Sequence, residues 1–138
     1  MSTSEKCTRF VELWNLVFMQ YYHHPDGTRE NLPAPSIDTG MGLERATIVM
    51  QGSETMYETD LFSSLITQVC SISGHEYGKD LETDYAIRAI AEHTRSSTFL
   101  TADGVVPGNE GRGYVLRRVI RRAIRLARKL GLQESFMS

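Results

Sequence analysis

Two segments of the chain carry side chains that could bind charged ligands. In the first, residues 36–45, glycines at positions 40 and 42 would let the backbone approach a ligand closely. Asp38 offers a carboxylate to an ammonium group, and Arg45 offers a planar cation that can bind phosphate or stack on a purine. These residue types indicate a candidate site for a small ligand.

The second segment, residues 109–131, is strongly basic. It holds eight cationic side chains against one acid, Glu110, a net charge of +7. The whole chain has a formal net charge of −2, so the remainder must carry −9. A basic patch on an acidic chain is typical of a protein with a phosphate-bearing partner, and nucleic acid is the first candidate.

The spacing within this segment predicts an amphipathic helix from about Gly111 to Lys129. At about 100° per residue, the apolar side chains fall on one half of the surface, at Val115, Leu116, Val119, Ile120, Ala123, Ile124, Ala127 and Leu130. The cations occupy the rest, at Arg112, Arg117, Arg118, Arg121, Arg122, Arg125, Arg128 and Lys129. A row of guanidinium groups that can each fork onto phosphate oxygens suits a nucleic-acid backbone.

A glycine-rich loop precedes this helix and contains Asn109. An amide side chain both donates and accepts hydrogen bonds, as contact with a base edge in a wide, shallow RNA groove requires. Arginines on phosphates would mainly position the duplex, whereas Asn109 could discriminate between bases.

Each segment also has a purely structural interpretation. Asp38 and Thr39 could cap a helix, with Glu44 and Arg45 as a surface pair, and a lone Gly-x-Gly is weak evidence for a ligand. Asn109 could equally be a loop or cap residue. The basic helix could be a solvated face, a membrane-surface helix or a protein-docking helix. No acid lies between Arg112 and Lys129 to form the pairs of a solvated face, and the apolar face lacks Trp or Phe anchors for a membrane.

Composition narrows the class of protein. No apolar run approaches the roughly 18 to 20 residues of a membrane span, and the first residues lack signal-peptide features, so we expect a cytoplasmic protein without membrane contact. Only two cysteines are present, Cys7 and Cys70, far apart and without clustered ligands, so we expect no disulfide framework, no zinc and no other metal site. We expect neither His75 nor His93 to be a ligand or a base.

The elements that would position these residues change type along the chain. Residues 10–22 are apolar, aromatic and β-branched on both alternating faces, which predicts a strand buried on both sides. A turn is predicted at residues 25–27, and the prolines of residues 32–37 favour an extended strand that returns. A helix is predicted over residues 43–50, ending at Gly52.

Beyond residue 55 the pattern is helical. Residues 60–73 predict a helix that Thr59 could cap, and residues 85–100 predict another after a polar loop over residues 74–84. The sequence therefore predicts an α+β protein, with an antiparallel strand pair in a first domain, residues 1–55, and helices in a second, residues 56–138.

Together these motifs resemble the alanyl-tRNA synthetases, a class II aminoacyl-tRNA synthetase family. The resemblance runs from about residue 9 to about residue 131, in the family's order. It rests on residues 12–20 (ELWNLVFMQ), 36–45 (SIDTGMGLER) and 108–122 (GNEGRGYVLRRVIRR), with support from residues 57–62 and 89–95. Such enzymes attach alanine to their tRNA with the use of ATP and magnesium.

The resemblance implies roles for individual residues. Residues 40–45 match the family's motif 3, whose arginine, here Arg45, contacts ATP beside Gly42. Asp38 matches the carboxylate that holds the amino group of alanine, Gly40 matches a pocket glycine, and Asn15 matches a strand facing the active site. Asn109 matches an asparagine implicated in recognition of the G·U pair of the acceptor stem. The arginines of the basic helix match its support: Arg112, Arg117, Arg118, Arg121, Arg122 and Arg125.

Motifs 1 and 2 of class II synthetases have no counterpart in this sequence, and neither do the editing domain with its zinc ligands and the C-terminal domain. We therefore expect a partial ligase that is inactive alone and binds no nucleotide tightly. An uncovered apolar face at Trp14, Leu16 and Phe18 predicts self-association or pairing with the missing catalytic segments. A non-enzymatic RNA-binding module, or an assembly partner acting in trans, is the alternative.

Overall fold

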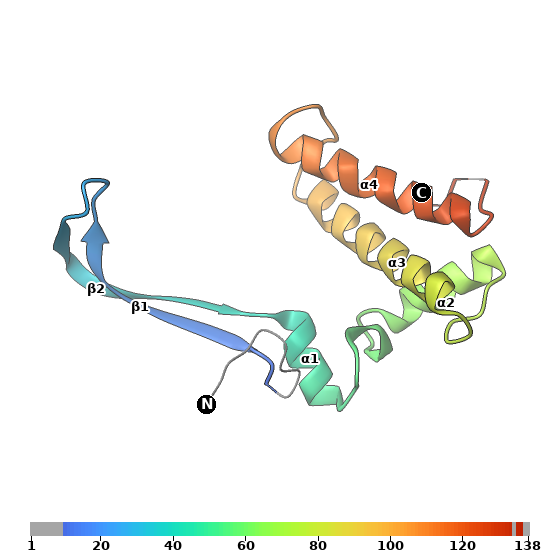
Figure 1. The fold of residues 1–138 in the computed structure, drawn as a ribbon, viewed down its shortest axis with the longest axis horizontal. Helices are drawn as coiled ribbons and strands as arrows, with labels where there is room; N and C mark the ends of the chain where they lie inside the picture. The colour runs from blue at the N-terminus through green and yellow to red at the C-terminus, as the bar shows by residue number, and fades with distance from the viewer. Residues whose placement is uncertain (1–9, 134, 137–138) are drawn as a thin grey trace. The chain divides into compact units, whose positions relative to one another are not determined.

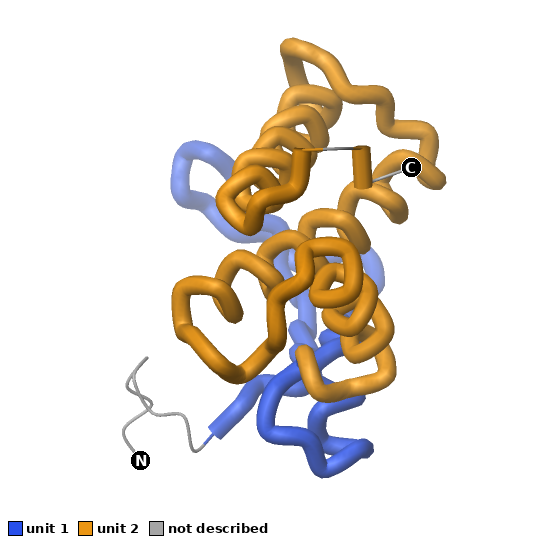
Figure 2. Tube along the Cα trace, turned by 90° about the vertical axis from the view of Figure 1, so that its right-hand side faces the viewer, with its two compact units in different colours: residues 1–56 blue, residues 57–138 orange. Residues whose placement is uncertain are grey.

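The structure is a computed structural model that describes residues 10–133, 135 and 136. The chain divides into two compact units, residues 1–56 and residues 57–138 (Figure 2). A two-stranded sheet and α1 belong to the first, and α2, α3 and α4 belong to the second (Figure 1). The α+β class predicted from the sequence is confirmed.

The first unit is built on a β-hairpin. β1 (Trp14–His23) and β2 (Arg29–Met41) pair antiparallel, beginning with Trp14 opposite Met41. The sequence predicts a strand from Phe10, but β1 begins four residues later, because β2 ends at Met41 and gives the preceding residues no partner strand. The predicted returning strand is present and longer than the segment around the prolines.

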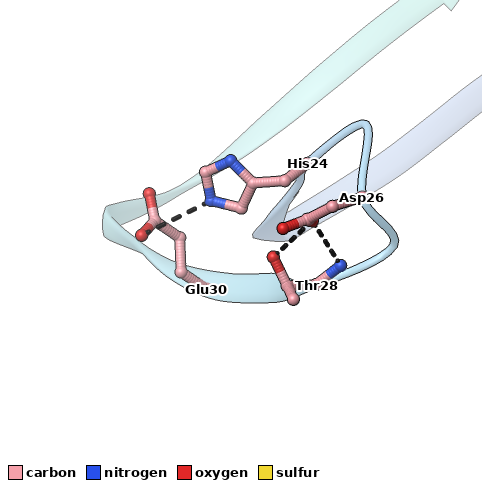
Figure 3. Close-up of polar contacts among 4 residues, drawn as sticks. All are labelled: His24, Asp26, Thr28 and Glu30. Carbon is pink, nitrogen blue, oxygen red and sulfur yellow. Dashed lines mark hydrogen bonds and ion pairs between the residues drawn. The ribbon is translucent and has the colours of Figure 1, made fainter.

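The predicted turn at residues 25–27 closes the hairpin (Figure 3). Asp26 Oδ1 accepts hydrogen bonds from the Thr28 amide at 2.9 Å and the Thr28 hydroxyl at 2.7 Å, which lowers the pKa of Asp26. His24 Nε2 lies 3.6 Å from a carboxylate oxygen of Glu30 on β2. Local side-chain contacts therefore stabilise the turn of the hairpin.

The register of the hairpin shifts between Met19 and Tyr21, opposite the part of β2 that contains Pro33 and Pro35. Proline has no N–H to donate, so the ladder of hydrogen bonds is interrupted there. Both strands of a two-stranded sheet are edges, where proline is tolerated.

Both faces of the hairpin are exposed, so the prediction of a strand buried on both sides is wrong for the described chain. On one face Trp14, Leu16 and Phe18 are 59%, 52% and 68% exposed; on the other, Val17 is 45% exposed. A doubly apolar strand is buried only where further layers cover it. No described residue supplies such layers.

α1 (Leu43–Gln51) follows β2 directly, with Gly42 at its N-cap position. It ends at Gly52, whose φ of 65° lies in the left-handed region that glycine adopts freely. Asp38 and Thr39 lie within β2, so the interpretation of these residues as helix caps is wrong.

The second unit consists of α2 (Ser63–Ser73), α3 (Leu81–Ala102) and α4 (Gly111–Lys129), preceded by a short 3₁₀ helix, η1 (Met56–Glu58). α3 contacts both α2 and α4. The predicted bounds of the basic helix are confirmed.

Two predicted helix starts are wrong. α2 begins at Ser63 rather than Asp60, and its N-cap position is Phe62 rather than Thr59. α3 begins at Leu81, within the predicted loop, because the Asp80 side chain accepts a hydrogen bond from the Thr83 amide at 2.8 Å and caps the helix.

The core of this unit lies between the helices. Its largest fully buried apolar side chains are Ile87 and Ile90 of α3 and Leu116 of α4, each 0% exposed. Burying side chains of this size contributes about 1.5–3 kcal/mol each. Alanines complete the contact and let the helices pack closely, at Ala86, Ala89, Ala91, Ala123 and Ala127. This packing fixes which face of α4 is left for its arginines.

Candidate nucleic-acid interface

α4 buries one side and presents its arginines on the other. Leu116 and Ala123 are buried, whereas the six predicted contact arginines are all exposed: Arg112, Arg117, Arg118, Arg121, Arg122 and Arg125. Two residues predicted to face inward, Val115 and Ile124, are 48% and 38% exposed. The buried strip is narrower than predicted because α4 packs mainly on α3.

Some of these cations have partners on α3. Arg122 Nη2 donates to the Tyr85 hydroxyl at 2.8 Å, and Lys129 Nζ lies 3.6 Å from a carboxylate oxygen of Glu82. Periodicity along α4 alone could not indicate these partners, since they lie on another helix. Within the described residues, four of the predicted contact arginines have no hydrogen bond or ion pair: Arg112, Arg118, Arg121 and Arg125.

The loop that carries Asn109 is held against the first turn of α4. The Gly108 amide donates to the Gly113 carbonyl at 3.0 Å, and a Cβ atom on Gly113 would lie 2.5 Å from the Val106 carbonyl oxygen. The N-cap position is Glu110, so Asn109 does not cap the helix. Close backbone packing, which requires glycine at position 113, therefore sets the position of Asn109.

Asn109 and four residues of α4 line an open pocket of about 310 Å³: Tyr114, Arg117, Arg118 and Arg121. Arg117 Nη1 donates a hydrogen bond to Asn109 Oδ1, and the Arg118 guanidinium lies 6.0 Å from the centre of the Tyr114 ring. The sequence prediction did not include Tyr114. Its position four residues before Arg118, on the same helix face, is the signal that could have identified it.

The three residues matched to an alanine pocket lie on one face of the hairpin. Asn15 pairs with Gly40, and Val17 pairs with Asp38. Cross-strand partners share a face and side chains alternate along each strand, so Asn15, Asp38 and Gly40 lie on the same side. No heavy atom lies within 4 Å of a Cβ built on Gly40, so the described residues do not close a pocket there.

Arg45 lies in the first turn of α1, just after Gly42. Its Nη1 atom donates to the Glu12 carbonyl at 2.8 Å, and a Cβ on Gly42 would lie 3.5 Å from the Arg45 side chain. Arg45 is exposed and bonds to the residues just before β1, near the strand end that carries Asn15. This position is compatible with a contact to phosphate or purine, and the remainder of an ATP site would have to come from other residues.

A half-buried polar cluster joins η1 to α3. The Arg88 guanidinium lies 5.1 Å from the ring centre of Tyr57 and 5.2 Å from that of Tyr77. Tyr57 donates to Glu92, and burial together with this bond raises the pKa of Tyr57 well above its usual range. Every charge in the cluster has a partner, so its role is structural.

No three of the described His, Cys, Asp and Glu side chains cluster as a metal site would require. Cys70 is free and half-buried, and Cys7 lies outside the described residues. His93 Nε2 is buried without a hydrogen-bond partner in the described part of the chain. Burial and the nearby Arg122 lower the pKa of His93. No described helix is long and apolar enough to cross a bilayer.

The Gly-x-Gly-Leu-Glu-Arg segment spans the end of β2 and the start of α1, and the arginine-faced α4 follows it later in the chain, in the order on which the resemblance to class II synthetases rests. In agreement, residues 1–138 match the family described as tRNA synthetases class II (A), and the chain belongs to this family.

Its relatives include alanine–tRNA ligases. One from Dehalococcoides mccartyi is 58% identical over 132 residues, and one from Psychromonas ingrahamii is 55% identical over 135 residues. A third, from Acidithiobacillus ferridurans, is 54% identical over 135 residues. These alignments cover 96%, 98% and 98% of this chain, respectively, but only 15% of each ligase.

Proposed function

We propose that this chain is part of an alanine–tRNA ligase and that α4 with its preceding loop binds the acceptor stem of alanine tRNA. The observation that carries the proposal is the exposed arginine row of α4, which has no acid on its own helix, in a chain similar to alanine–tRNA ligases. Phosphate contacts of this kind supply affinity and fix register but carry no sequence information.

Base preference in this proposal belongs to Asn109. It is exposed, lies at the N-terminal end of the arginine row and lines the same pocket as Arg118 and Arg121. With phosphates on the arginines, the amide would meet the base edges in the shallow groove of the acceptor stem, at its G·U pair.

For the first unit we propose a share of the alanine and ATP site. Asp38 would hold the ammonium group of alanine beside Asn15 and Gly40, and Arg45 would contact ATP next to Gly42. The exposed hairpin faces support a site that needs further polypeptide to close it. We therefore infer that the chain alone does not form alanyl-adenylate. ATP–pyrophosphate exchange with alanine tests this, and turnover by the chain alone would contradict it.

The RNA contact is tested with an acceptor-stem hairpin containing G·U or G·C, titrated at several salt concentrations. We expect tighter binding to the G·U hairpin and a steep salt dependence. Replacing Arg121 or Arg125 with Gln should weaken binding to both hairpins equally. Each replacement should also reduce the salt slope by about 1, because one phosphate fewer is neutralised.

Ser63→Gln is the matched control, because Ser63 is exposed on α2 and carries no cation. Absence of binding at low salt would refute the proposal. Binding with a steep salt slope but no G·U preference would instead support a general RNA-binding module acting in trans and would exclude base recognition by Asn109.

A further inference from the structure

We propose that Arg117 is a positioning residue that fixes the orientation of the Asn109 amide and thereby sets the base preference of this site. The proposal rests on the proposed function and deepens it. It assigns Arg117 a role different from that of the other arginines of α4, which would bind phosphates.

The geometry distinguishes Arg117 from its neighbours. Its Nη1 atom donates to Asn109 Oδ1, whereas Arg118 and Arg121 line the same pocket without a hydrogen bond to Asn109 among the described residues. Asn109 and Arg117 are eight residues apart in the sequence, so their hydrogen bond connects the loop to the helix. It is not one of the neighbour pairs three or four residues apart on a helix surface.

The chemistry of the two side chains makes this contact directional. The two ends of an asparagine amide are nearly equal in shape, but one end accepts hydrogen bonds and the other donates. A guanidinium group has only donors, so Arg117 can hold only the oxygen end of Asn109. The bond thus excludes the flipped amide, leaving the amino group and one carbonyl lone pair of Asn109 for a base edge.

The backbone of Asn109 is held by main-chain contacts of the loop. Gly111, two residues later, has a φ of 53°, and the Gly108 amide is bonded to the Gly113 carbonyl at 3.0 Å. With its backbone and its carbonyl oxygen both held, Asn109 would meet an incoming duplex in one orientation. A preorganised amide discriminates between donor and acceptor patterns, whereas a freely flipping amide can adapt to either.

The test compares Arg117→Met with Arg121→Met, which remove the cation at two positions of one pocket. Arg121→Met should weaken hairpin binding and reduce the salt slope by about 1, because the proposal places Arg121 on a phosphate. We expect a preference for G·U over G·C of roughly tenfold in the unmodified chain, within the range of one directed base contact. Arg117→Met should reduce this preference to about twofold or less, Arg121→Met should leave it intact, and Arg117→Lys, which retains a donor, should restore most of it.

A measurement without RNA separates this proposal from the proposed function. The side-chain amide resonances of Asn109 should shift in Arg117→Met and remain in place in Arg121→Met. If they do not shift, or if the G·U preference survives Arg117→Met, the positioning role is refuted while the RNA contact stands. An unmodified chain without G·U preference would refute base recognition by Asn109, and this proposal with it.

Discussion

Gly113 allows the packing of the Asn109 loop to be tested by a single methyl group. In Gly113→Ala, the added Cβ would lie 2.5 Å from the Val106 carbonyl oxygen and 3.0 Å from the Gly108 nitrogen. Both are backbone atoms, so no side-chain rotation can relieve the overlap. Either the loop moves away from α4 or the start of the helix is displaced.

The expected change in the free energy of unfolding of Gly113→Ala is the balance of two opposed effects. Overpacking costs about 1–3 kcal/mol, whereas replacing glycine with alanine inside a helix gains up to about 1 kcal/mol. We expect a net loss of about 1–2 kcal/mol in the free energy of unfolding. For a unit of this size, each kcal/mol lowers Tm by about 4–8 °C.

Thermal unfolding of the whole chain, followed by far-ultraviolet circular dichroism, measures this loss. The matched control is Gly108→Ala in the same loop, because a Cβ there meets its nearest atom only at 3.9 Å and the backbone amide is retained. The control should unfold like the unmodified chain. If Gly113→Ala does so as well, the close packing between loop and helix is refuted, and with it this account of how Asn109 is positioned.

Three further predictions concern the core, the buried histidine and the hairpin. Leu116→Ala should reduce the free energy of unfolding by about 2–5 kcal/mol in urea titrations, against less than about 1 kcal/mol for the exposed Val115→Ala. Folding lowers the pKa of His93 from its ordinary value of 6.5. As the pH falls through 6.5, the unfolded state therefore binds more protons than the folded state, and the free energy of unfolding decreases. His93→Gln should flatten this decrease in urea titrations at about pH 8 and pH 5.5, and an unchanged pH dependence would contradict it. Phe18→Ser should reduce self-association measured by sedimentation, since Phe18 is 68% exposed.

The basic helix can be predicted from the sequence because one segment contains all the necessary information. Its apolar residues repeat at helical spacing, and glycines mark its start. By contrast, the start of α3 is not predicted correctly, because Asp80 and Asp84 give the preceding segment a polar, loop-like composition. In the structure Asp80 caps the helix, and Asp84 is buried and accepts a hydrogen bond from the Gly78 amide at 2.7 Å.

The candidate site likewise contains some features that the sequence predicts and others that it does not. The exposed arginines follow from periodicity alone, whereas the contact between Arg117 and Asn109 depends on how the loop folds back. The partners of Arg122 and Lys129 lie on α3 and depend on tertiary packing. The composition of residues 10–22 predicts buried faces, but burial also requires a covering layer, which the sequence of a strand does not contain.

The exposed hairpin depends on neighbours through its main chain as well as its side chains. In a two-stranded sheet every strand is an edge strand, so about half of the amide and carbonyl groups of β1 and β2 point outward, away from the other strand. A strand added along either edge would satisfy those groups, and a layer placed over a face would bury Trp14, Leu16 and Phe18. The same hairpin can therefore be extended within its plane and covered above and below. Polypeptide that completes it would thus stabilise the sheet while bringing new residues beside Asn15, Asp38 and Gly40.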